Sequence, residues 1–270
     1  MARRSLVEMI HNASKEETDY ASEFLTDLDY HIKKLEKESK REPSHTFKPS
    51  SIKCPRCAVM QVLGVKQDNE IRSSNLIGIT SAGTFIHEMM QSKILTMKNW
   101  EYVDVAKYVS SNDDLEVTKP CNFEKGEYET KLHSKKWNMN FLVDGILKKN
   151  NKYMILEIKS ISSNGFFKTK EVPDKYKDQA ISYCILTGLS DVLFLFVDRD
   201  LFNMKTFLFS PSREDKLKWK SVMSHNLKYV EKSVIPSKPS YADKLFCQYC
   251  SYTSYCKSIG EEEYEFGKEL

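Results

Sequence analysis

Two carboxylates and a lysine lie in one segment of the chain, FLVDGILKKNNKYMILEIKS, where two apolar runs flank a polar stretch. Asn150 and Asn151 suit a two-residue hairpin turn, because Asn tolerates positive φ. Such a turn sets Asp144 directly opposite Glu157. Lys159 then falls on the same face of the second strand, because side chains alternate along a strand. The spacing therefore predicts that all three groups converge on one patch.

Two carboxylates placed side by side repel each other unless a cation lies between them. Their oxygen atoms suit Mg²⁺ or Mn²⁺. A lysine beside a metal-bound water can hold or deprotonate that water and can offset developing negative charge, which is what phosphodiester hydrolysis needs. The alternative is an ordinary exposed sheet face with a Glu–Lys pair. The apolar character of both strands favours the metal site, because buried charge is costly without a partner.

Seven cysteines form the second chemical feature of the chain. Five of them lie in two tight groups, CPRC starting at residue 54 and CQYCSYTSYC starting at residue 247. In a reducing compartment, grouped thiols bind metal more often than they form disulfides. Two CxxC pairs are also typical of a four-cysteine zinc site. Cys121 and Cys184 stand apart and are expected to be core thiols.

Helices and strands must position these groups, and the hydrophobic pattern predicts a mixed α/β fold around one sheet. Helices are predicted at 15–41, at 80–100 with Thr80 or Ser81 as N-cap, at 174–187, and at 213–233 with Ser212 as N-cap. Strands are predicted in pieces over 101–134, including YVDVAKYV, and at 137–148, 152–160, 192–197 and 204–209. Residues 41–51 read as a loop, and the acidic end EEEYEFGKEL as frayed.

Composition excludes several classes of protein. Of the 270 residues, 40% are hydrophobic and 29% are charged, as in ordinary globular domains. No GxGxxG or GxxxxGK(S/T) motif occurs, which disfavours Rossmann and P-loop nucleotide sites. The longest apolar run, 192–197, is too short for a membrane span, and the N-terminus lacks a secretory pattern. A net charge of +3 permits nucleic-acid binding without demanding it. The chain is therefore expected in the cytoplasm.

The set of Asp144, Glu157 and Lys159 resembles the catalytic residues of the PD-(D/E)XK nucleases, in particular of the RecB-like branch. That branch includes the AddB nuclease domain, CRISPR-associated RecB-like exonucleases and phage exonucleases. That branch carries a His on an early helix, then Asp, then (D/E)xK, then QxxxY. The matching residues here are His87, Asp144, Glu157 with Lys159, and Gln179 with Tyr183. The resemblance covers about residues 51–257, most of the chain.

The resemblance implies a restriction-endonuclease-like α/β core, with a central mixed sheet flanked by helices. It also implies a role for each matching residue. His87, Asp144 and Glu157 would bind Mg²⁺ or Mn²⁺, with the Ile158 carbonyl as a further ligand. Lys159 would position or activate the attacking water. Gln179 and Tyr183 would orient Lys159 or the DNA backbone.

Iron–sulfur members of this branch have one cysteine ahead of the core and a CxxC-(x5)-C group after it. The matching residues are Cys54, Cys247, Cys250 and Cys256, which would hold a [4Fe–4S] cluster and staple the ends of the domain together. Cys57 departs from this pattern, since five cysteines compete for four ligand places. Zinc is the alternative occupant, because both metals accept four thiolates.

The resemblance implies a metal-dependent DNA nuclease, expected to be an exonuclease acting at DNA ends or on single strands in recombination, replication or processing, in a bacterial or phage-infected cell. A structure-specific endonuclease and a non-catalytic iron–sulfur or zinc DNA-binding subunit are the alternatives. A helicase, recombinase or single-strand-binding protein, or a second copy, could be a partner. The expected divisions are a helical extension over 1–50, the nuclease domain over 51–260 and an acidic tail over 261–270.

The stretch SISSNGFFKTKEVPDKYK follows the second strand of the hairpin and interleaves two phenylalanines with lysines. Aromatic and cationic side chains in this mixture suit single-stranded DNA, by stacking and by phosphate contact. The alternative is a solvated loop with Phe166 and Phe167 tucked beneath it.

Overall fold

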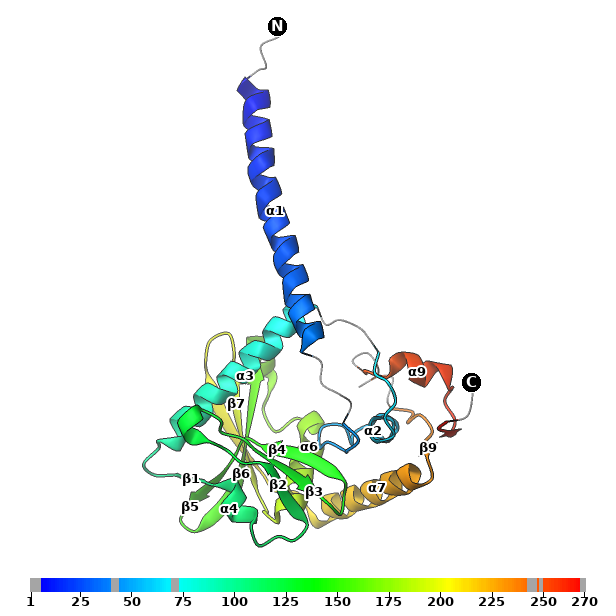
Figure 1. Ribbon diagram of the computed structural model, residues 1–270. Coiled ribbons are helices and arrows are strands. Elements are labelled where there is room, and N and C mark those ends of the chain that lie inside the picture. Colours follow the sequence, from blue (N-terminus) through cyan, green and yellow to red (C-terminus); the bar gives the residue numbers. More distant parts are fainter. Residues whose placement is uncertain (1–5, 40–43, 69–72, 242–246, 248–249, 268–270) are drawn as a thin grey trace. The chain divides into compact units, whose positions relative to one another are not determined.

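The structure is a computed structural model that describes residues 6–39, 44–68, 73–241, 247 and 250–267 (Figure 1). The chain divides into two compact units, residues 1–42 with 69–81 and residues 43–68 with 82–270. Among the described helices, none is long and apolar enough to cross a membrane.

The first unit consists of helix α1 (Leu6–Glu38) and the beginning of helix α3 (Ser74–Leu95). The Ser74 hydroxyl donates to the Asp29 carboxylate, which also pairs with Lys33 one turn away. The prediction that α3 starts at Thr80 or Ser81 is wrong. The helix begins six residues earlier, where the Ser73 hydroxyl accepts the amide of Leu76.

A five-stranded mixed sheet forms the centre of the second unit, in the order β1-β5-β6-β7-β8. Its strands are β1 (Glu101–Val103), β5 (Gly145–Lys149), β6 (Lys152–Ile161), β7 (Val192–Asp198) and β8 (Met204–Phe209). β6 and β7 run parallel, and the other neighbours run antiparallel. The parallel pair needs a crossover, which helix α6 (Asp174–Thr187) supplies as predicted. The prediction of a central mixed sheet is confirmed.

A second sheet of three strands contains β2 (Leu115–Lys119), β3 (Thr130–Ser134) and β4 (Met139–Val143). The single strand predicted over 137–148 is therefore wrong: it divides at Asp144 into β4 and β5, which belong to different sheets. The reason is a contact with distant segments of the chain. The Asp144 carbonyl accepts hydrogen bonds from Gln91 and Tyr102 instead of a strand neighbour.

Helices account for two further differences from the predicted strands and loops. The sequence YVDVAKYV forms β1 and then helix α4 (Val105–Val109), because the Asp104 carboxylate caps the amides of Ala106 and Lys107. The stretch after β6 contains helix α5 (Ser163–Lys168), which buries Phe166 and leaves Phe167 57% exposed. The remaining helical elements are α2 (Pro55–Val62), η1 (Phe123–Lys125), α7 (Arg213–Glu231) and α9 (Thr253–Ser258).

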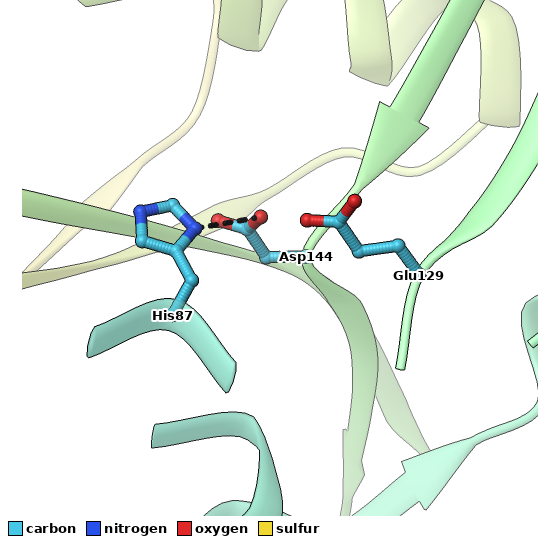
Figure 2. Close-up of side chains that lie close together, drawn as sticks. All are labelled: His87, Glu129 and Asp144. Carbon is cyan, nitrogen blue, oxygen red and sulfur yellow. Dashed lines mark hydrogen bonds and ion pairs between the residues drawn. The ribbon is translucent and has the colours of Figure 1, made fainter. Parts of the chain in front are cut away.

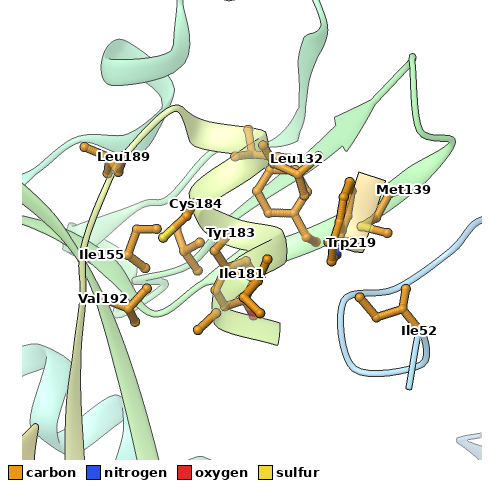
Figure 3. Close-up of a cluster of buried hydrophobic side chains, with 14 of the residues drawn as sticks. Ile52, Leu132, Met139, Ile155, Ile181, Tyr183, Cys184, Leu189, Val192 and Trp219 are labelled. Carbon is orange, nitrogen blue, oxygen red and sulfur yellow. The ribbon is translucent and has the colours of Figure 1, made fainter. Parts of the chain in front are cut away.

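Apolar side chains cover both faces of the central sheet. On one face, Ile155 and Val192 belong to a buried cluster with Ile181 and Cys184 of α6, and the same cluster extends to Trp219 of α7 (Figure 3). The opposite face presents Met154, Leu156 and Ile158 to Ile86, Met90 and Ile94 of α3. The alternation predicted for β6 is confirmed, and helices flank the sheet on both sides. The Ser212 cap of α7 is also confirmed, as a capping box with Asp215.

The frayed end predicted for EEEYEFGKEL is wrong for the part that the structure describes. Strand β10 (Tyr264–Glu265) pairs with strand β9 (Val234–Ile235). The amide of Phe266 also donates to the Ser233 carbonyl. The acidic residues therefore lie beside a short antiparallel strand pair that holds this segment to the end of α7.

Candidate active site and cysteine cavity

The β5–β6 hairpin has the register predicted from the sequence. Gly145 pairs with Leu156, and the same register carried one step further sets Asp144 opposite Glu157. Asn150 and Asn151 have φ values of 48° and 62°, the left-handed pair that a type I′ turn requires. A two-residue turn thus fixes which side chains meet at the far end of the hairpin.

Asp144 is held in place by hydrogen bonds to both carboxylate oxygens and to its carbonyl. One carboxylate oxygen accepts the backbone amide of Ile158 at 2.5 Å. The other lies 3.3 Å from Nδ1 of His87, on α3. Gln91, one turn further along α3, donates to the Asp144 carbonyl at 2.7 Å. Helix α3 therefore brings the predicted histidine to the predicted aspartate. The carbonyl of Ile158 as a ligand stays a prediction.

Glu129 joins His87 and Asp144, although the sequence did not single it out. One ligand atom from each residue lies within 4.8 Å of the other two, and Figure 2 shows the three side chains converging. The β3–β4 register pairs Thr130 with Val143, so Glu129 comes directly opposite Asp144. The same pairing argument that found Glu157 would have found Glu129, had the β3–β4 hairpin been recognised.

Glu157 and Lys159 lie next to this group and form a buried ion pair, 2.5 Å apart, with side-chain exposures of 4% and 17%. The Lys159 ammonium also donates to the side-chain oxygen of Gln179 at 3.1 Å. Gln179 in turn donates to the Tyr183 hydroxyl at 2.6 Å. Gln179 and Tyr183, predicted to share one face of α6, are therefore connected to Lys159 and restrain its ammonium group.

The carboxylates of the site repel one another. Burial, followed by the negative charge of Asp144, raises the pKa of Glu157 to about 7. The same two causes raise the pKa of Glu129 to about 7. Burial lowers the pKa of His87, but its hydrogen bond and proximity to Asp144 outweigh that effect and raise it. A divalent cation would offset this accumulation of negative charge.

All five grouped cysteines line one cavity of about 210 Å³, made by the start of α2, Lys238, Cys247 and residues of the range 250–261. The sulfur of Cys57 lies 3.2 Å from that of Cys250. The hydrogen bond between Cys57 and Cys250 lowers the pKa of Cys250 to about 6 and raises the pKa of Cys57. A hydrogen bond with Cys57 is also the largest cause that lowers the pKa of Cys54 to about 7. Readily ionised thiols are suited to bind a metal.

Arg56, between the two cysteines of CPRC, is 1% exposed and ties this region together. Its Nη atoms donate to the backbone carbonyls of Pro236, Gly260 and Glu262 at 2.6, 2.5 and 2.9 Å. Segments about 180 to 206 residues apart in the chain are thus joined by one guanidinium group.

Comparison with known proteins gives structural likenesses only. No protein-family model and no curated protein matches the chain. The structure of SSO0001 is similar, with 14% identity, a TM-score of 0.49 and coverage of 85% of this chain and 96% of that one. LHK-Exo in complex with dAMP shows 14% identity and a TM-score of 0.45, covering 70% and 89% of the two chains. The alkaline exonuclease LHK-Exo from Laribacter hongkongensis shows 13% identity and a TM-score of 0.44, with the same coverage. The functional argument therefore rests on the site itself.

Proposed function

We propose that this chain is a divalent-metal-dependent deoxyribonuclease with a restriction-endonuclease-like core, and that it acts as an exonuclease on DNA ends or single strands. The observation that carries the proposal is the convergence of His87, Glu129 and Asp144 within 4.8 Å, beside the buried Glu157–Lys159 pair. An acidic, oxygen-rich site with one imidazole suits Mg²⁺ or Mn²⁺. A buried lysine at such a site can orient the attacking water, which a purely structural ion pair does not do.

His87, Asp144 and Glu157 would hold the metal, with Glu129 available as a further acid. When bound, the cation would polarise a phosphoryl oxygen and lower the pKa of a water molecule. Lys159 lies beside Glu157 and would orient the water that attacks phosphorus in line, while the bond to the leaving oxygen breaks. Gln179, braced by Tyr183, would keep the lysine directed at that water.

DNA would reach the site along helix α5, which directly follows the strand that carries Glu157 and Lys159. Phe166 is buried, whereas Phe167 is 57% exposed and precedes Lys168 and Lys170. An exposed aromatic ring with nearby ammonium groups can stack on a base and contact phosphate. Each of the two interpretations of this stretch thus applies to one phenylalanine. Phe166 packs beneath the helix, and Phe167 is available to DNA.

The cysteine cavity would hold a thiolate-ligated metal centre, a [4Fe–4S] cluster with zinc as the alternative. The donor set fits, because five thiols surround a cavity several times larger than the ~30 Å³ of one water molecule. The family pattern assigns the ligand places to Cys54, Cys247, Cys250 and Cys256. In this role the centre would join the start of α2 to the segment around α9 and would not need to do redox chemistry.

The test is a nuclease assay on end-labelled linear DNA and covalently closed circular DNA, with Mn²⁺, Mg²⁺ or EDTA. We expect metal-dependent loss of the linear substrate only, and no loss with Glu157→Ala. Glu116→Ala, which changes an exposed carboxylate on β2, is the matched control and should leave cleavage unchanged.

Two other outcomes point to the alternative functions. Cutting of the closed circle by the wild type, but not by Glu157→Ala, would replace the exonuclease proposal by an endonuclease. Absence of cleavage on both substrates, with DNA bound and the folded state intact, would leave a non-catalytic DNA-binding subunit.

A further inference from the structure

The cysteine cavity has five thiols for the four ligand places of a metal centre, so one thiol is surplus. The family pattern makes Cys57 the surplus thiol, because it has no counterpart there. The structure gives the opposite indication. The sulfur of Cys57 lies 3.2 Å from that of Cys250, which is one of the trailing cysteines.

Helix α2 explains why Cys57 faces the cavity. Cys54 is the N-cap of α2, and Pro55 fixes the first helical position. Residues three apart on a helix lie on the same face, so Cys57 follows Cys54 on the side that lines the cavity. A CxxC pair at a helix start therefore delivers two thiols to one place. Cys247 and Cys250 form a second pair with the same spacing.

Arg56 provides a second observation at this cavity. Its side chain lines the cavity and is 1% exposed, yet its Nε atom has no hydrogen-bond partner among the described residues. A buried N–H without an acceptor is rare in folded proteins. A thiolate or sulfide at the centre would supply the missing acceptor.

We propose that Cys57 is a ligand of the metal centre, in the place that the family pattern gives to Cys256. Two CxxC pairs, Cys54 with Cys57 and Cys247 with Cys250, then hold the metal, and Cys256 is the surplus thiol. The inference rests on the metal centre assigned above and applies to an iron–sulfur cluster or to zinc, since both take four thiolates.

The test compares Cys57→Ser and Cys256→Ser, with Cys121→Ser as a control outside the cavity. Each protein is purified anaerobically, and iron, acid-labile sulfide and zinc are measured per chain together with the visible spectrum. We expect Cys57→Ser to lose most of its metal, while Cys256→Ser and Cys121→Ser keep the wild-type content. Iron with sulfide identifies a cluster, and stoichiometric zinc identifies a single ion.

Full metal content in Cys57→Ser would overturn the inference, as would a wild-type protein without metal. Metal loss in both Cys57→Ser and Cys256→Ser would keep Cys57 as a ligand and overturn the assignment of Cys256 as surplus. Failure of the nuclease proposal is recognised separately. Glu157→Ala should abolish cleavage with an unchanged metal content at the cysteines, and its nuclease assay does not depend on which thiol is surplus.

A second measurement serves if Cys57→Ser does not fold. The folded wild-type protein is treated with iodoacetamide, with and without removal of the metal, and alkylation at each cysteine is measured by mass spectrometry. We expect Cys256 to react in the metal-loaded protein and Cys57 to react only after the metal is removed. Alkylation of Cys57 in the loaded protein would contradict its role as a ligand.

Discussion

Asp144 organises the candidate active site through four hydrogen bonds. Its carboxylate contacts the Ile158 amide and His87, and its carbonyl contacts Gln91 and Tyr102. A side chain fixed in this way loses little further freedom when it binds a cation, which is the condition for a preorganised metal site. The neighbouring Glu157 is buried and Glu129 is half-buried, and their carboxylates repel that of Asp144, so a bound cation would stabilise the site.

Glu129 offers a test of which acids hold the metal. Glu129→Gln removes one charge from the group of three at nearly constant shape. Because loss of an outer partner of a metal site already costs ~10–100-fold in affinity, we expect Mn²⁺ to bind at least ~10-fold more weakly. Isothermal titration calorimetry measures this. Glu127→Gln, at an exposed position two residues away, is the control, and equal affinity in both variants would remove Glu129 from the site.

Lys159 should affect the reaction rate and leave DNA binding nearly unchanged. Its ammonium contacts Glu157 and Gln179 inside the site and has little exposed surface for phosphate contact. Loss of a positioned proton-transfer or water-orienting group costs ~10²–10⁴-fold. We expect a fall of that size in single-turnover rate for Lys159→Ala. Filter binding of DNA in Ca²⁺ provides the comparison, and joint loss of binding and cleavage would contradict the role.

The hairpin of β5 and β6 carries the site because its turn sets the register. A shift of one residue would move Glu157 and Lys159 to the face occupied by Met154, Leu156 and Ile158. The second hairpin, β3–β4, brings Glu129 to the same point by the same rule. Two short turns, together with one helix that bears His87, thus position the acids.

The turn can be tested through Asn151, whose φ is 62°. Residues other than Gly and Asn lose roughly 1–2 kcal/mol in the left-handed region, because Cβ crowds the following carbonyl. We expect Asn151→Ala to lower the free energy of unfolding by about 1 kcal/mol. Asn151→Gly, the matched variant without Cβ, should change it little. Urea denaturation measures both, and equal stabilities would show that this turn does not constrain the register.

In the second unit, contacts between segments distant in the chain join strands that the hairpins do not connect. Asp191, 6% exposed at the start of β7, accepts hydrogen bonds from Ser190 and Ser210 and pairs with Lys152 at the start of β6. Burial raises its pKa, but these three partners outweigh that effect and lower it to about 2. Three strands of the central sheet are joined at this carboxylate.

This contact should make stability depend on pH in a defined direction. An unfolded Asp has a pKa of ~3.9, so a folded pKa of about 2 means that ionised Asp191 stabilises the protein above pH ~4. The contribution is lost as the pH falls towards 2. We expect Asp191→Asn to be less stable than wild type at pH 5, by a difference that shrinks near pH 2. Urea unfolding at both values tests this, with exposed Asp113→Asn as the control. A difference independent of pH would contradict it.

Local sequence determined the parts of this protein that depend on neighbours along the chain. The Asn-Asn turn and the alternation of β6 predicted the hairpin register, and helical spacing predicted α6 with Gln179 and Tyr183 on one face. The cap of α7 followed from Ser212. These predictions succeeded because turn geometry, pleat and helical period act over a few residues.

Tertiary structure decided which of these pieces meet. Three features depend on segments far apart in the chain. They are the division of 137–148 at Asp144, the position of Glu129 beside Asp144, and the contact between Cys57 and Cys250. Arg56 is the clearest case, since its acceptors lie about 180 to 206 residues away. No local propensity encodes such contacts, because they arise only when packed layers bring the segments together and buried polar groups must find partners.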